Sequence, residues 1–139
     1  MNRLLNSLLD FYLLAPLPVL AAEALQGEIR LMRASEDPVW IGQETEIYLE
    51  LWSNGFSFGD QSFRLPEVKG GFLLQADSST TQLSENRNGG QWLGLRYTLL
   101  LYPQRAGRLI VPAFDVGFSS RAGFGTEATA FELSTRSLQ

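Results

Sequence analysis

Residues 92–118, WLGLRYTLLLYPQRAGRLIVPAFDVGF, decide the fold class of this 139-residue chain. Apolar side chains alternate through the first half of the stretch and therefore share one face of a predicted strand: Leu95, Tyr97, Leu99 and Leu101. A turn follows over residues 103–107, where Gly107 tolerates a positive φ, and Leu109 and Val111 continue the apolar face beyond it. Two strand-like runs joined by a tight turn indicate an all-β domain.

Short strands and turns also fill the sequence on either side of this stretch. Residues 44–53 alternate strictly, and residues 86–90, NRNGG, form the strongest hairpin turn because Asn and Gly adopt left-handed conformations readily. Further strands are predicted over 29–34, 72–76, 80–83, 91–102, 114–119 and 129–134, with a short edge strand in the loop 56–71 and an edge strand or bend at 38–42. About seven strands without helical periodicity predict an immunoglobulin-like antiparallel β-sandwich, and a partly open barrel is the structural alternative.

Length and composition restrict the function classes. A chain of 139 residues with 45% hydrophobic and 19% charged residues is expected to form one globular domain. Its net charge of −4 and scattered arginines argue against a nucleic-acid partner. Cysteine and histidine are both absent, which excludes disulfides, thiol nucleophiles and Ser-His-Asp hydrolases and removes the commonest zinc ligands.

The N-terminus, residues 1–22, has the pattern of a signal peptide. Arg3 supplies the positive charge, residues 11–20 are mostly apolar, and small residues follow at Ala21 and Ala22. The alternatives are an uncleaved membrane anchor and a buried N-terminal strand. We therefore expect an exported protein in which residues 23–139 form the sandwich domain.

Three aromatic residues are the candidates for an interaction surface: Trp52, Phe56 and Phe58. Trp52 shares its strand face with Tyr48 and Glu50, which predicts that the indole is exposed. Phe56 and Phe58 lie on a predicted glycine-flanked loop, where apolar side chains can mark a docking surface. The alternative for each is packing in the core or across strands, the commoner role of aromatic residues at strand positions.

Carboxylates offer a weaker indication of chemistry. Glu46 and Glu50 project from one strand face, and paired carboxylates can hydrolyse glycosidic bonds. A solvated strand face needs such residues in any case, so we predict no catalytic residue. Loop acids at Asp60, Glu67 and Asp77 lack the alternating spacing of a calcium loop, and we predict neither a metal site nor a cofactor.

Turn and strand-start motifs occur in a characteristic order between residues 36 and 134. They are Ile41-Gly42-Gln43-Glu44, Phe63-Arg64-Leu65-Pro66-Glu67-Val68 followed by Gly71-Phe72, the Asn88-Gly89 turn, Tyr97-Thr98-Leu99, Pro103-Gln104-Arg105-Ala106-Gly107 and Ile110-Val111-Pro112. This order resembles the BatD family of oxygen-tolerance (aerotolerance) proteins. The additional β-domains and C-terminal membrane helix of that family are not found within these 139 residues.

The resemblance implies a periplasmic, non-enzymatic module with immunoglobulin-like domains, associated with MoxR-type ATPases and von Willebrand A domain proteins of the inner membrane. The implied role is protein–protein interaction at the cell envelope, for which edge-strand addition and aromatic loop contacts are physical routes. The alternative is a small carbohydrate-binding module that stacks an exposed Trp52 or Trp40 on sugar rings. Membrane association is expected only through an uncleaved N-terminal segment or a partner.

Overall fold

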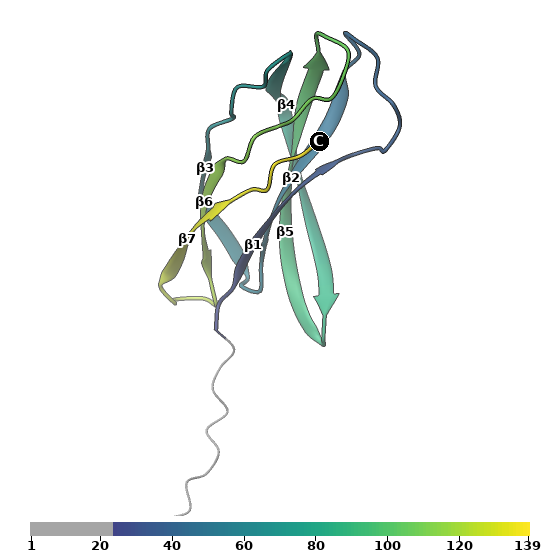
Figure 1. Cartoon of the computed structure of the whole chain (residues 1–139). Coiled ribbons are helices and arrows are strands. Elements are labelled where there is room, and N and C mark those ends of the chain that lie inside the picture. The colour runs from purple at the N-terminus through teal and green to yellow at the C-terminus, as the bar shows by residue number, and fades with distance from the viewer. Residues whose placement is uncertain (1–23) are drawn as a thin grey trace, which may run out of the picture.

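The computed structural model describes residues 24–139, apart from the side chains of residues 78 and 79, and shows an all-β fold (Figure 1). The predicted leader over residues 1–22 lies outside the described residues. Seven strands follow one another along the chain: β1 Gly27–Arg33, β2 Thr45–Ser53, β3 Ser57–Phe63, β4 Gly71–Arg87, β5 Gly90–Pro103, β6 Asp115–Arg121 and β7 Ala128–Ser134. All the pairings between them are antiparallel.

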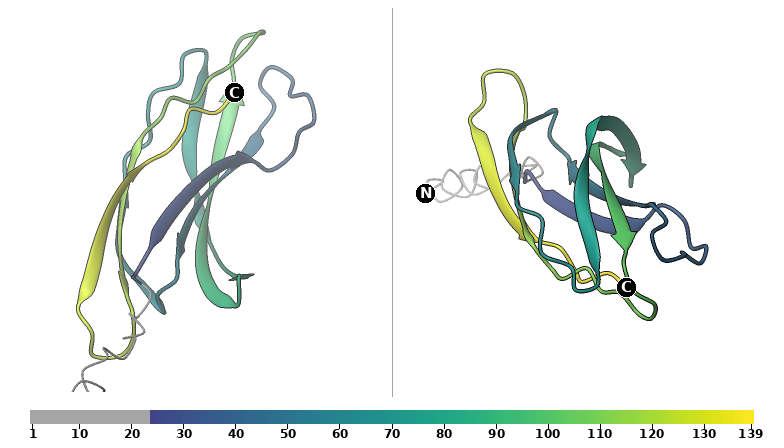
Figure 2. Two further views of the ribbon diagram at one scale, coloured as in Figure 1. Left: turned by 60° about the horizontal axis from the view of Figure 1, so that its bottom comes forward. Right: turned by 90° about the horizontal axis from the view of Figure 1, so that it is seen from above.

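The strand order identifies the type of sandwich. One sheet has the order β1-β2-β5-β4 and the other the order β3-β6-β7. Figure 2 shows the same fold from two further directions. Constant-type immunoglobulin domains place strands A, B, E and D in one sheet and C, F and G in the other, which is the same order. The predicted immunoglobulin-like sandwich is therefore confirmed. The open-barrel alternative is wrong, because in the described part of the chain no strand ladder joins the two sheets.

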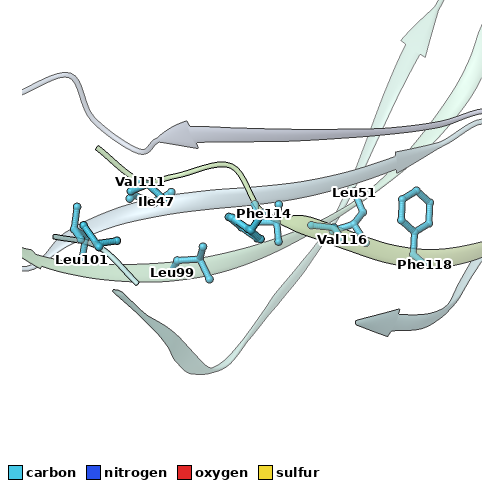
Figure 3. Close-up of a cluster of buried hydrophobic side chains, with 10 residues drawn as sticks. Ile47, Leu51, Leu99, Leu101, Val111, Phe114, Val116 and Phe118 are labelled. Atoms are coloured by element: carbon cyan, nitrogen blue, oxygen red, sulfur yellow. The ribbon is translucent and has the colours of Figure 1, made fainter. Parts of the chain in front are cut away.

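The core lies between the inner faces of the two sheets. Period-two alternation turns Ile47, Leu49 and Leu51 of β2 inward, and they are at most 1% exposed. Leu99 of β5 lies opposite Ile47, and Val116 of β6 meets this layer from the facing sheet. Figure 3 shows Ile47, Leu51, Leu99 and Val116 among the buried side chains between the strands. Burial of each such aliphatic side chain stabilises the fold by about 1.5–3 kcal/mol.

Two predictions about strand boundaries need correction. Strand β4 runs continuously over Gly71–Arg87 in place of two short strands, and its register against β5 shifts between Gln75 and Thr80. After the 103–107 turn no strand continues, because Pro112 has no N–H for a ladder and only Val111 forms a bridge, to Leu138.

Two turn predictions hold. Asn88 and Gly89 have φ values of 50° and 79°, as a two-residue type I′ hairpin requires. Gly107 has a φ of 108°, so the positive φ expected there is also found. Residues 38–42, predicted as an edge strand or a bend, form no strand.

Candidate functional site

Trp52, expected to be exposed, is buried: only 4% of its surface is accessible. Gly94 lies directly opposite it on β5, and a Cβ at Gly94 would approach the indole ring to 2.8 Å. Because glycine has no side chain, the Trp52 indole ring can lie against the sheet at this position. Arg30 and Arg87 cover it, with guanidinium carbons 5.1 and 5.3 Å from the ring centroid. The prediction of exposure was wrong because these neighbours come from other strands.

Arginines and tryptophans alternate across this outer surface of the four-stranded sheet. Arg87 lies between Trp52 and Trp92, with its guanidinium carbon 4.3 Å from the Trp92 ring centroid. The series Arg30, Trp52, Arg87 and Trp92, together with the carboxylates that bind it, is called the outer-face cluster below. Cation–π contacts of this kind contribute about 0.5–2 kcal/mol each, depending on how far they are desolvated.

Carboxylates compensate the arginines of the outer-face cluster. Arg87 Nη1 lies 2.6 Å from Glu28 Oε2, Arg87 Nη2 lies 3.2 Å from Glu85 Oε2, and Arg30 Nε lies 3.0 Å from Glu28 Oε1. Burial alone would raise the pKa of Glu28, but hydrogen bonds from Arg87 and Arg30 outweigh it and lower that pKa below its ordinary value. The positive charges of Arg30 and Arg87 are thus paired with carboxylates of the same cluster.

Glu50 is also part of this surface and is not solvated as expected. It is 3% exposed and accepts hydrogen bonds from Trp52 Nε1 at 3.1 Å and from Arg96 Nε at 2.8 Å, with Arg96 Nη2 2.7 Å away. Glu46, on the same strand face, stays exposed and accepts a bond from the Tyr48 hydroxyl. Glu50 therefore stabilises the outer surface of the sheet through these bonds, and its carboxylate is not free to contact a ligand.

Phe56 and Phe58 have separate surroundings. Phe58 lies on β3 instead of a loop, is half-buried, and packs with its ring centroid 5.7 Å from that of Phe118 in the core. Phe56 is 38% exposed and its ring meets that of Phe124, which is 93% exposed, at 4.7 Å. Of the three predicted surface residues, only Phe56 is exposed enough to contact a partner. Trp52, Phe56 and Phe58 therefore do not form one site.

A pocket opens at the other end of the sandwich, where β1 and β5 end and β2 begins. Its volume is about 530 Å³, in the range of ligand pockets. Its walls are mostly apolar and include Ile47, Leu101, Leu109 and Val111. Trp40 and Ile41 border it and are 78% and 60% exposed. We call this end of the molecule, with its pocket, the tip.

Backbone hydrogen bonds hold Trp40 and Ile41, the exposed apolar residues of the tip, in place. The Gly42 N–H donates to the Pro103 carbonyl at 2.6 Å, and the Gln43 N–H donates to the Trp40 carbonyl at 3.0 Å. Gly42 has a φ of 79°, which only glycine adopts easily. On the far wall, Val111 and Leu138 exchange two backbone bonds of 2.7 and 2.9 Å. The exposed Trp40–Ile41 pair is therefore fixed to the end of β5.

Three arginines line the tip, namely Arg33, Arg105 and Arg108. Arg33 is engaged: its Nη2 donates to the Asp37 carbonyl at 2.6 Å and its Nη1 lies 3.9 Å from Glu36. Arg105 and Arg108 are exposed, and neither forms an ion pair with any residue of the range 24–139. The tip thus combines apolar surface with unpaired positive charge.

Sequence reasoning missed the tip because its walls come from segments far apart in the chain. The local signal was present: Val39, Trp40 and Ile41 form an apolar run that ends at Gly42 and pairs with no strand. Between residues 24 and 139 no cluster of three or more acidic side chains could hold a metal ion. The same part of the chain contains no helix long and apolar enough to cross a membrane.

Comparisons with known proteins add no relative. No family model, curated protein or solved structure matches this chain. Strand order and packing identify the immunoglobulin-like sandwich.

Proposed function

We propose that this protein is a non-enzymatic binding module of the cell envelope that docks another protein at its tip. The observation that carries the proposal is the exposure of Trp40 and Ile41 beside an apolar pocket. Large apolar side chains held outward by backbone bonds lose less main-chain freedom on binding than those of an unrestrained loop. Aromatic anchors next to a pocket are the usual centres of protein interfaces.

The proposed compartment and partners come from the sequence. The leader pattern of residues 1–22 supports export to the periplasm, and the resemblance to BatD proteins supports a partner among the inner-membrane von Willebrand A domain proteins linked to MoxR-type ATPases. An immunoglobulin-like sandwich whose two ends carry different loops is well suited to such an adaptor role.

Site-specific photocrosslinking in intact cells tests this proposal. A benzophenone amino acid is placed at Ile41 and, as a matched control, at Phe124, an exposed apolar residue in a loop at the opposite end. We expect a discrete adduct with an envelope protein from position 41 and none from position 124. Adducts only from position 124 would move the docking surface to the Phe56–Phe124 pair, and identical or absent adducts at both positions would contradict docking at the tip.

Exposure of Trp40 also favours a second candidate, a carbohydrate-binding module. An exposed indole can stack on a sugar ring, although the neighbouring pocket wall is mostly apolar. Titration with a panel of envelope glycans separates the candidates, because sugar stacking would change the fluorescence of the wild-type protein and not that of the W40F variant. An unchanged spectrum across the panel would exclude glycan binding at Trp40.

A further inference from the structure

The charges of the tip indicate what kind of partner it binds. Arg105 and Arg108 line an apolar pocket and lack a carboxylate partner in the described part of the chain. Both arginines line the pocket, and the Arg105 side chain also packs over Gly70, where a Cβ would come within 2.8 Å of its side-chain atoms. The tip therefore presents two free cations beside apolar walls.

An apolar partner alone would be a poor fit to this site. Inserting it would strip water from the two guanidinium groups without replacing the lost hydrogen bonds, and unpaired desolvated charges are costly. A carboxylate beside the apolar group removes this cost and forms charge-assisted hydrogen bonds with arginine. The chain as a whole carries a net charge of −4, so the attraction for an acidic partner is local to the tip.

Trp40 and Ile41 distinguish a peptide from a small amphiphile. Both side chains extend the apolar surface beyond the pocket itself and remain largely exposed. Both residues line the pocket, but because they are 78% and 60% exposed, a small molecule seated inside would leave much of their surface in water. An extended peptide would cover that surface and also reach Arg105 and Arg108, which line the same pocket. The surface to be covered is therefore larger than the pocket.

We infer that the tip binds a partner segment in which a bulky apolar side chain enters the pocket and a neighbouring aspartate or glutamate pairs with Arg105 and Arg108. This inference rests on the proposed function, since it names the chemistry of the segment that docks there. The apolar contact supplies affinity, and the carboxylate supplies orientation and selectivity against neutral or basic segments.

Peptide selection from a random display library tests the inference. The purified protein, the charge-reversed R105E/R108E variant and the apolar-rim variant W40A/I41A are used as separate targets. The reversed arginines are exposed and unpaired, so the fold is expected to persist, and circular dichroism together with a milder R105Q/R108Q variant checks this. We expect apolar-acidic peptides from the wild type, apolar-basic peptides from R105E/R108E, and loss of both from W40A/I41A.

Binding measurements on one selected peptide complete the test. We expect its Kd to rise at least about tenfold in R105E/R108E and to rise when the salt concentration increases, as a charge pair requires. If the wild type and R105E/R108E select the same peptides without charge bias, and W40A/I41A loses them, the tip still docks a protein but the carboxylate is wrong.

The remaining outcomes concern the occupant itself. If no selected peptide depends on Trp40 and Ile41, both docking at the tip and its acidic partner are overturned. Sodium decanoate and decyltrimethylammonium serve as small probes of either charge. If decanoate binds to the tip while no peptide does, the occupant is a small anionic amphiphile and the peptide proposal falls.

Discussion

The outer-face cluster and the tip both bring tryptophan and arginine together, yet with opposite results. In the outer-face cluster, Trp52 is 4% exposed and its flanking arginines bind Glu28 and Glu85. At the tip, Trp40 is 78% exposed. The arginines nearest the pocket there include two without a carboxylate partner among residues 24–139.

The two regions differ in whether the rest of the chain covers the tryptophan and pairs the arginines. Gly94 makes room for the Trp52 ring, and carboxylates of the same chain neutralise the charges of the arginines that cover it. Trp40 is largely exposed, and Arg105 and Arg108 beside the pocket have no carboxylate partner among residues 24–139. Arginines and aromatic rings whose charges are paired by carboxylates of the same chain stabilise the fold. Where the arginines are unpaired and the ring is exposed, both can contact another molecule.

Truncating the two tryptophans should produce the largest effect and directly test the comparison. We expect W52A to lower the free energy of unfolding by about 3–5 kcal/mol, because it empties a buried site and removes the rings on which two arginines stack. W40A should change it by less than about 0.5 kcal/mol, because the side chain is exposed. Urea unfolding followed by far-UV circular dichroism measures both without depending on tryptophan fluorescence.

Similar losses in the two variants would break the comparison. A large loss in W40A would mean that the tip is part of the stabilised framework, and the proposed docking surface would lose its main support. A small loss in W52A would mean that the outer-face cluster adds little to stability despite its burial.

Neutralising a single carboxylate should give an intermediate effect. E50Q keeps the size of the side chain but removes the charge that Arg96 and Trp52 bind, and we expect a loss of about 2 kcal/mol. The loss stays below that of a fully buried ion pair because the Arg96 side chain is 30% exposed and can regain water. The matched control E46Q, on the same face of β2 but exposed, should change stability by less than about 0.5 kcal/mol.

Two results would contradict this prediction. An E50Q protein as stable as the wild type would show that the ion pair only offsets its own desolvation. Equal losses in E50Q and E46Q would indicate a general effect of charge on β2 instead of a specific network.

The sandwich could be predicted from the sequence because its signals are local. Alternation in β2 and in β5 depends only on residues within each strand, and the Asn88-Gly89 turn depends on the turn residues themselves; all three are found in the structure. The continuous β4 could not be predicted, because its strand is held by pairing with β5 across a register shift and not by its own weak alternation. Long-range pairing overrode local propensity there.

The candidate surfaces were harder to predict because they depend on neighbours from several strands. Trp52 is buried by Gly94 from β5 and Arg87 from β4, neither of which is visible in the pattern of β2. The tip pocket likewise joins the β1–β2 loop, the segment after β5 and Leu138. Of the three predicted surface residues, only Phe56 was placed correctly as exposed, since its loop position is a local property.

The smallest predicted effect is the acid dependence of the outer-face cluster, tested with E28Q. The folded-state pKa of Glu28 lies below its ordinary value of 4.5, since the hydrogen bonds from Arg87 and Arg30 favour the charged form. Its contribution to stability is therefore complete above about pH 4.5 and is lost as the pH falls through the folded-state pKa. The contribution should be below about 1 kcal/mol, because the carboxylate is 40% exposed and solvent screens the pair.

Urea unfolding of wild type and E28Q between pH 3 and pH 7 measures this difference. The two stability curves should be separated at neutral pH and converge in acid, while the control E127Q, at an exposed position without an ion pair in the described chain, should follow the wild type throughout. Curves that stay parallel down to pH 3 would show that Glu28 acts through packing and not through charge. The outer-face cluster would then differ from the tip in shape alone, and the reason for expecting an acidic partner at Arg105 and Arg108 would be weakened.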